Sequence, residues 1–209
     1  MHFSRNAFCG LLLFLVATVC NAEPQVDKEY RVIPQQPTPS GKKIEVIEFF
    51  FYGCPYCNQL QPFLDEWRKH MPDNVVFIRK PAVHKESWIP LTKTYFALEA
   101  MGELENLHSA VFYSYHVDDL HLSEQSVMFD WAAKHGLDAK KFSEIYISRE
   151  TAAKIEQAKK TTKDYEISGT PSLVVDGKYL TSSGMVEEVK DLVPILDYLI
   201  KLARKDRVQ

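Results

Sequence analysis

The sequence predicts an α/β protein that carries an inserted all-helical unit. Residues 44–52 are apolar at nearly every position, which is typical of a central strand covered on both faces, and a helical pattern follows directly. Residues from about 87 to 165 show helical patterns and no strand pattern. Strand patterns return at 172–175 and 178–181, on either side of an Asp-Gly turn. Strands that flank a purely helical block indicate a sheet-based domain interrupted by helices.

The sheet-based part begins with polar, proline-rich residues 23–41, in which 30–33 is the expected short strand. After the strand at 44–52, a helix is expected over about 55–70 with a bend at Pro62, because apolar residues recur there at helical spacing, namely Leu60, Phe63, Leu64 and Trp67. A second strand is expected at 75–78. The last helix is expected over about 185–204, with a kink at Pro194.

The helical block divides at capping residues. Ser87, Ser123 and Asp138 stand where helices should begin, and Gly102 and Gly136 stand where helices should end. These signals predict a helix from Ser87 through Met101 and further helices at about 104–115, 127–133, 142–147 and 151–163. We therefore expect a sheet-based domain made of residues 23–85 and 166–209, with residues 86–165 as an inserted helical domain.

Residues 1–22 have the pattern of a secretory signal peptide. Arg5 supplies a basic start, residues 7–19 are apolar, and small residues around Ala22 suit cleavage after it. The apolar run is shorter than the roughly 20 residues that a membrane span needs. A lipoprotein signal with an acylated Cys20 is the alternative, although the bulky Val19 disfavours it.

Cleavage after Ala22 would remove Cys9 and Cys20, and Cys54 and Cys57 would be the remaining cysteines. Any disulfide in the processed protein would then be the one between them. The formal net charge of the whole chain is −3 and no cluster of basic residues stands out, so a nucleic-acid partner is not expected.

The Cys54-Pro55-Tyr56-Cys57 segment stands where the strand ends and the helix begins, which suits disulfide exchange. Unpaired amides and the macrodipole at a helix N-terminus favour negative charge on the first sulfur. The second cysteine lies one turn inside the helix and is shielded. We therefore expect Cys54 to be the nucleophile and Cys57 to be the resolving thiol.

The same physics predicts the direction of electron flow. If the pKa of Cys54 falls from about 8.5 to about 5, the thiolate outnumbers the thiol about a hundredfold at pH 7, and the reduction potential rises by about 60 mV. A stabilised thiolate makes the disulfide easier to reduce. Such a protein donates its disulfide to other thiols.

A Cys-x-x-Cys pair can also bind a metal or form a structural disulfide. A zinc site needs two more ligands, but there is no second cysteine pair and the histidines are dispersed along the chain, so no metal is expected. A purely structural disulfide across two residues would remove little chain entropy. A redox-active disulfide, with no further cofactor, is the preferred interpretation.

A second motif, Gly169-Thr170-Pro171, stands directly before the returning strand. Together with the upstream Cys-x-x-Cys it resembles the cis-proline loop of the thioredoxin superfamily. That resemblance implies that the loop faces the cysteines and that Thr170 and Pro171 contact bound substrate. Without the cysteine motif, a proline at this place would simply mark the start of a strand.

The motifs together resemble DsbA-type thiol:disulfide oxidoreductases. The resemblance rests on Glu-Phe-Phe-Phe-Tyr-Gly-Cys-Pro-Tyr-Cys, the helical insertion, Gly-Thr-Pro and the following Val-Asp-Gly-Lys-Tyr, and it spans most of residues 44–204. Thioredoxin and glutaredoxin have no room for such an insertion, and too few residues precede Cys54 for the N-terminal dimerisation domain of the isomerase branch. The resemblance implies a thioredoxin-like fold with an inserted all-helical domain.

Pro55, Tyr56 and Glu48 are the expected redox-tuning residues. Many DsbA-like proteins have histidine where Tyr56 stands, and that ring helps to hold the thiolate, so a milder oxidant is expected here. Glu48 lies in the buried strand, where a lone carboxylate must be partnered or protonated. It resembles the family's buried acid, which relays the proton of Cys57. A salt bridge with Arg79 or Lys80 is the other interpretation, and both can hold together.

The resemblance implies a periplasmic enzyme that oxidises newly exported polypeptides through a mixed disulfide and is reoxidised by a DsbB-like membrane partner. One alternative is a periplasmic peptide-binding holdase with secondary redox activity, in which apolar residues would line a groove, namely Phe49 to Tyr52, Trp88, Phe112 and Tyr113. The other alternative is a disulfide reductase or isomerase. A reduction potential near that of thioredoxin, about −270 mV, would indicate a reductant.

Overall fold

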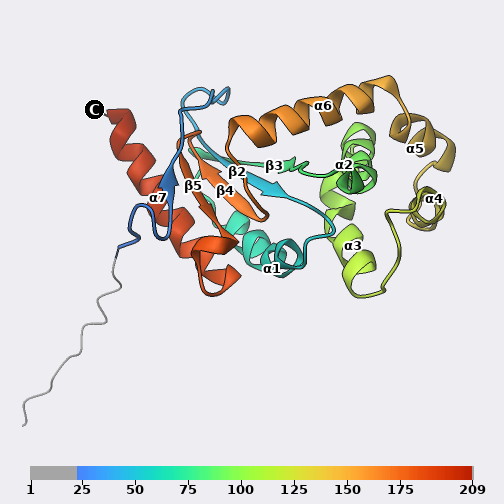
Figure 1. Cartoon of the computed structure of the whole chain (residues 1–209), viewed down its shortest axis with the longest axis horizontal. Helices are drawn as coiled ribbons and strands as arrows, with labels where there is room; N and C mark the ends of the chain where they lie inside the picture. Colours follow the sequence, from blue (N-terminus) through green and yellow to red (C-terminus); the bar gives the residue numbers. More distant parts are fainter. Residues whose placement is uncertain (1–22, 209) are drawn as a thin grey trace, which may run out of the picture.

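The computed structural model describes residues 23–208 (Figure 1). Five strands form one sheet in the order β1-β5-β4-β2-β3. They are β1 (Arg31–Val32), β2 (Ile44–Phe50), β3 (Val75–Pro81), β4 (Ser172–Val175) and β5 (Tyr179–Ser182). The central strand β2 runs parallel to β3 and antiparallel to β4. The expected signal peptide and the possible lipid anchor at Cys20 lie outside the described residues, so both stay predictions.

The strand β2 is buried along its whole length and separates two apolar layers. On one face, Ile44 and Val46 pack with α1 (Pro55–Lys69) and α7 (Leu192–Val208) through Leu60, Leu64 and Leu196. On the other face, Ile47 and Phe49 pack with residues that include Ile33, Tyr165 and Ile167. The predicted central strand is therefore confirmed.

The prediction of a kink at Pro194 is wrong. The segment before α7 forms two short 3-10 turns, η2 (Ser183–Met185) and η3 (Val189–Asp191), and α7 begins at Leu192. Pro194 therefore lies in the first turn of the helix, where its missing N–H would have no intrahelical partner. Pro62, in contrast, does lie inside α1.

The inserted unit consists of η1 (Glu86–Trp88), α2 (Ile89–Met101), α3 (Leu104–His116), α4 (Gln125–Lys134), α5 (Ala139–Tyr146) and α6 (Arg149–Asp164). The helices α2 to α5 lie together beyond one end of the sheet, and α6 leads back toward it (Figure 1). Among the described residues, no helix combines the length and apolar character needed to cross a membrane.

Some of the predicted caps differ from the observed ones. Asp138 caps α5 by accepting a hydrogen bond from the N–H of Lys141, as expected, and Gly102 ends α2 with a positive φ of 77°. Ser87 lies within η1, and Glu124 rather than Ser123 precedes α4, so neither serine is an N-cap. The 3-10 turn and the preceding loop set where those helices begin, and sequence signals alone do not resolve such boundaries.

The active-site end of the sheet shares its core with the helical unit. Phe50, Tyr52 and Cys57 belong to one buried cluster with side chains of the inserted helices, among them Leu98, Phe112, Met128, Trp131 and Phe142. The cysteine motif therefore lies at the junction of the two parts of the chain.

Candidate active site

Cys54 and Cys57 occupy the first turn of α1. Cys54 is the N-cap residue, with an extended backbone conformation, and Pro55 follows at the first helical position, where its fixed φ suits a helix start. Cys54 is half-buried and Cys57 is completely buried, and both sulfurs are free thiols. The predicted pair of one accessible and one shielded cysteine is what the geometry shows.

The environment of Cys54 lowers its pKa from 9.0 to about 6. The hydrogen bond from the side chain of Cys57 has the largest effect, and burial opposes it. Hydrogen bonds from the Thr170 side chain and from the backbone N–H groups of Cys57 and Tyr56 lower the pKa further. The helix N-terminus therefore contributes as expected, but the neighbouring thiol contributes more, and the pKa stays above the value of about 5 considered from the sequence.

Cys57 has the opposite environment. Burial raises its pKa well above 9.0, and its contact with the Cys54 sulfur raises it further. A thiolate at Cys57 would be costly because the surrounding side chains offer little solvation. The two sulfurs are thus held in different protonation states near pH 7.

The Gly169–Pro171 loop lies against Cys54. When Cys54 is protonated, its thiol donates a hydrogen bond to the backbone oxygen of Thr170 at 3.2 Å, and the Thr170–Pro171 peptide bond is cis. The hydroxyl of Ser172 donates to the oxygen of Gly169 at 2.8 Å, which ties the loop to the start of β4. The two motifs that the sequence places far apart therefore form one site.

Glu48 lies beneath this site and is completely buried. Its Oε1 accepts a hydrogen bond from Nε2 of Gln61 at 2.7 Å, and its Oε2 lies 3.4 Å from Nε of Arg79. Burial raises the pKa of Glu48, while Arg79 and Gln61 act against that rise. The expected salt bridge between Glu48 and Arg79 is present. It forms because Glu48 of β2 and Arg79 of β3 are directly paired in the register of the two strands.

Gln61 was not identified from the sequence. It lies one helical turn after Cys57 on the same face of α1, and its Nε2 is 3.4 Å from the backbone oxygen of Cys57. It therefore links the second cysteine to the buried acid. A polar residue four positions after Cys57 on the buried face of the predicted helix was the available signal.

The groove proposed from the sequence is not formed by the residues expected. Phe49, Phe50, Tyr52 and Phe112 are buried in the core, so the expectation is wrong for these four, whereas Phe51 and Trp88 are half-buried and Tyr113 is exposed. A groove of about 680 Å³ does run beside the cysteine motif, between the start of α1 and the segment after β5, and its lining includes Tyr56, Gln59, Phe63, Ser183, Gly184 and Val186. Tyr56 and Phe63 are exposed apolar side chains in this groove.

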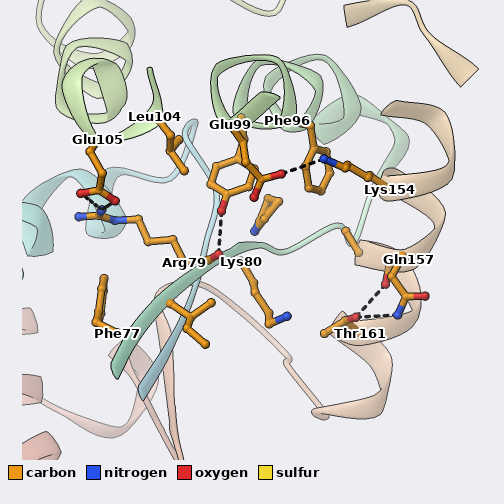
Figure 2. Close-up of a pocket in the computed structure, with 14 residues that line it drawn as sticks. Phe77, Arg79, Lys80, Phe96, Glu99, Leu104, Glu105, Lys154, Gln157 and Thr161 are labelled. Atoms are coloured by element: carbon orange, nitrogen blue, oxygen red, sulfur yellow. Dashed lines mark hydrogen bonds and ion pairs between the residues drawn. The ribbon is translucent and has the colours of Figure 1, made fainter. Parts of the chain in front are cut away.

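Another cleft, of about 390 Å³, lies between β3 and the helices of the inserted unit (Figure 2). Arg79 reaches across it to Glu105 of α3, with Nη1 and Oε1 at 3.1 Å, and Tyr95 donates a hydrogen bond to the backbone oxygen of Arg79. Neither Cys54 nor Cys57 lines this cleft. Its ion pairs connect the two parts of the chain at a distance from the reactive sulfurs.

The part of the chain that the structure describes contains no group of three or more His, Cys, Asp or Glu side chains placed to hold a metal ion. The chemistry of the site is that of two sulfurs with unequal acidity, set in a thioredoxin-like fold with a helical insertion. Fold and site together define a thiol:disulfide oxidoreductase.

Comparisons with known proteins give the family. The model of the DSBA-like thioredoxin domain matches residues 76–193. The thiol:disulfide interchange protein DsbA of Burkholderia cepacia is 34% identical over 188 residues, which cover 89% of each chain. DsbA of Pseudomonas aeruginosa is 35% identical over 179 residues, which cover 85% of this chain and 84% of that protein. This chain belongs to the DsbA family.

Solved structures agree with that assignment. The crystal structure of Pseudomonas aeruginosa DsbA superimposes with a TM-score of 0.81 at 33% identity, covering 87% of this chain and 95% of that chain. DsbA from Xylella fastidiosa gives a TM-score of 0.81 at 27% identity, covering 88% of this chain and all of that chain. The expected family and the thioredoxin-like fold with an inserted helical domain are confirmed, and the enzyme class is that of the protein-disulfide oxidoreductases.

Proposed function

We propose that this protein is a periplasmic dithiol oxidase that donates a Cys54–Cys57 disulfide to newly exported polypeptides. The observation that carries the proposal is the unequal acidity of the two sulfurs, with a pKa of about 6 at Cys54 and a strongly raised pKa at Cys57. The stable Cys54 thiolate favours the reduced protein, and therefore favours transfer of the disulfide to the substrate.

The proposed reaction has two thiol–disulfide exchange steps. A substrate thiolate attacks the accessible sulfur of Cys54, the Cys54–Cys57 bond breaks, and a mixed disulfide forms between substrate and Cys54. A second substrate thiolate then attacks the substrate sulfur of that bond and displaces Cys54. The substrate loses two electrons and two protons to form its disulfide, and the protein gains a dithiol. Cys54 is a good leaving group because its thiolate is stable.

Glu48 is proposed to relay the proton that Cys57 needs in the first step: its carboxylate, paired with Arg79, takes up a proton released by the attacking substrate thiol and passes it to Cys57. Cys57 is released as a buried thiolate whose raised pKa demands rapid protonation. Glu48 is a buried acid with a raised pKa, and Gln61 connects it to the backbone of Cys57. Protonation of Cys57 prevents it from attacking the mixed disulfide in reverse.

Substrate binding is proposed at two adjoining features. The first feature is the proline loop: the backbone of Thr170, which lies against Cys54, is proposed to pair with an extended peptide, because Pro171 has no N–H and its oxygen accepts from the N–H of Ser183. The groove beside Tyr56 and Phe63 offers apolar surface to a neighbouring side chain of that peptide. Unfolded or reduced polypeptides expose extended backbone and apolar side chains, whereas folded proteins bury both.

The oxidising power is proposed to be moderate. A pKa of about 6 gives about ten thiolates per thiol at pH 7, which corresponds to at most about 1.4 kcal/mol and about 30 mV. These are upper limits, because the half-exposed sulfur of Cys54 is partly screened by solvent. Tyr56 is consistent with this moderate strength, since it is exposed and lacks the charge of a protonated histidine.

The remaining parts of the proposal rest on the family assignment. Residues 1–22 would direct export and be cleaved, residues 23–85 and 166–209 would form the thioredoxin-like domain, and 86–165 the inserted domain. A DsbB-like membrane oxidase would restore the disulfide. No metal or further cofactor enters the proposed reaction.

The test uses a reduced peptide that contains two cysteines. The oxidised protein should form the peptide's disulfide catalytically in a glutathione redox buffer, and Cys54→Ser should abolish turnover while the variant stays folded. Cys57→Ser, mixed with the oxidised peptide, should accumulate a mixed disulfide, because the Cys54 thiolate opens the peptide's disulfide and no second protein thiol is present to displace Cys54. Peptide binding without turnover would favour the holdase alternative, and a potential near −270 mV would favour a reductant.

A further inference from the structure

Tyr52, two residues before Cys54, is held by three side chains from one face of α3. His108, Phe112 and His116 are spaced four residues apart, so successive turns of the helix present them on the same side. Nδ1 of His108 lies 2.9 Å from the Tyr52 hydroxyl, and Nε2–H of His116 donates to the Tyr52 backbone oxygen at 2.8 Å. The Phe112 ring meets the Tyr52 ring edge-on at 5.0 Å. The inserted unit therefore forms hydrogen bonds with Tyr52 at two places, the backbone oxygen and the phenol hydroxyl.

The contact of His108 with Tyr52 requires an energetically unfavourable burial of the imidazole ring. Both His108 and Tyr52 are about 1% exposed, and Nε2 of His108 has no hydrogen-bond partner among residues 23–208. Burial, with Arg79 and Arg68 nearby, lowers the pKa of His108 well below 6.5, so the ring is neutral. An apolar residue would avoid an unpaired buried nitrogen. Within the part of the chain that the structure describes, the bond to Tyr52 is the one hydrogen bond that the His108 ring makes.

The segment that Tyr52 belongs to contacts both sulfur-bearing residues. The N–H of Cys54 donates to the backbone oxygen of Phe51 at 3.0 Å. A backbone hydrogen bond from Phe51 to the sulfur of Cys57 acts to lower the pKa of that thiol. Because Tyr52 lies between Phe51 and Gly53, a shift of Tyr52 moves the backbone groups that face both cysteines.

We infer that His116 and His108 are positioning residues of the redox site, through which the inserted helical unit sets the acidity and potential of the Cys54–Cys57 pair. The inference rests on the proposed redox role of the two cysteines. It concerns differences between variants, so it is tested separately from whether the wild-type protein acts as an oxidant or a reductant.

The test separates the hydrogen bond of His116 from its ring. His116→Phe keeps an aromatic ring beside Phe112, which stacks on His116 at 6.1 Å, but removes the donor. His116→Gln keeps a donor at a similar reach. His135→Phe is the matched control, because His135 also bonds a backbone oxygen, that of Trp131 at 2.8 Å, and stacks on an aromatic ring, but it does so in α4.

The measurements are the equilibrium constant with glutathione at pH 7 and the pH titration of the Cys54 thiolate. His116→Phe should shift the equilibrium about tenfold toward the oxidised protein, equivalent to about 30 mV, and should raise the pKa of Cys54. His116→Gln and His135→Phe should stay within about twofold of wild type.

Three results would overturn the inference: a His116→Phe equilibrium within twofold of wild type, equal shifts in His116→Phe and His116→Gln, or an equal shift in His135→Phe. Should His116→Phe fail to fold, the comparison moves to the other end of Tyr52. There His108→Asn, which keeps a polar atom near the Nδ1 position, should retain the wild-type potential, and His108→Leu should lower it. Equal potentials in that pair would also overturn the inference.

Discussion

The sulfur of Cys54 lies 3.2 Å from the backbone oxygen of Thr170, although 116 residues separate the two in sequence. The whole helical insertion lies within that interval. The contact joins the helix N-terminus to the proline loop, so two motifs far apart in the sequence meet at one sulfur.

Replacing Cys57 should change the acidity of Cys54. The side chain of Cys57 has the largest effect on the lowered pKa of Cys54, so Cys57→Ala should raise that pKa from about 6 toward 9.0. Cys57→Ser keeps a hydrogen-bond donor and should raise it less. Thiolate absorbance against pH measures both. A Cys57→Ala variant that still titrates near 6 would show that the backbone amides alone stabilise the thiolate.

Reduction should stabilise the fold, and the effect should depend on pH. The pKa of Cys54 is lower in the folded protein, at about 6, than the ordinary value of about 8.5 in the unfolded chain. The stability that the thiolate contributes is therefore fully present above about pH 8.5 and is lost as the pH falls through 6. Urea unfolding of reduced and oxidised protein at pH 6, 7 and 8 should show a growing advantage of the reduced form, and the double serine variant should show no such pH trend. An oxidised form of greater stability would point to a structural disulfide.

Tyr56→His should make the protein more oxidising. The imidazole would place a donor near the Cys54 sulfur and would stabilise its thiolate further. A fall of one in the pKa corresponds to about 30 mV in potential. Equilibration with glutathione at pH 7 measures it, and Tyr56→Phe is the control for loss of the phenol. An unchanged potential and pKa would mean that residue 56 does not tune the site.

Glu48→Gln should slow the first exchange step. If Glu48 protonates the released Cys57, its loss should reduce the rate of mixed-disulfide formation by about tenfold or more, within the range of general acid catalysis. Glu45→Gln is the control, because Glu45 is also buried in β2 but bonds the N–H of Ser40 away from the cysteines. Stopped-flow measurement with a reduced peptide gives the rates. Equal rates in both variants would remove Glu48 from the mechanism.

Arg79→Met should destabilise the protein strongly. The side chain of Arg79 is 4% exposed and contacts Glu48, Asp65 and Glu105. Removing one partner of a buried ion pair typically costs about 3–5 kcal/mol, and Glu48→Gln in the same chain should recover part of it. Arg68→Met, which removes a more exposed partner of Glu105, should cost less than about 1 kcal/mol. Urea unfolding of the reduced proteins gives these values. A similar cost for both arginines would mean that Glu48 is not charged in the folded protein.

Local patterns were sufficient for much of the fold and for the reactive pair. The buried strand before Cys54, the amphipathic helix after Cys57 and the cap at Asp138 all depend on neighbours within a few residues, and the structure has them as expected. The family resemblance added Thr170 and Pro171. Boundaries set by other parts of the chain were less accurate, as Ser87, Ser123 and Pro194 show.

The amino-acid sequence by itself determined which two cysteines stand at the start of the helix and which of them is accessible and more acidic, because a helix N-terminus and a shielded first turn are local properties. The tertiary structure alone decided the partners of that pair. The choice of Arg79 over Lys80 as the partner of Glu48, the hydrogen bond from Gln61 to Glu48, and the contacts of His108 and His116 with Tyr52 join residues from different elements. Such contacts arise when burial forces polar groups to find partners across the core, and periodicity along the chain carries no record of which partner they find.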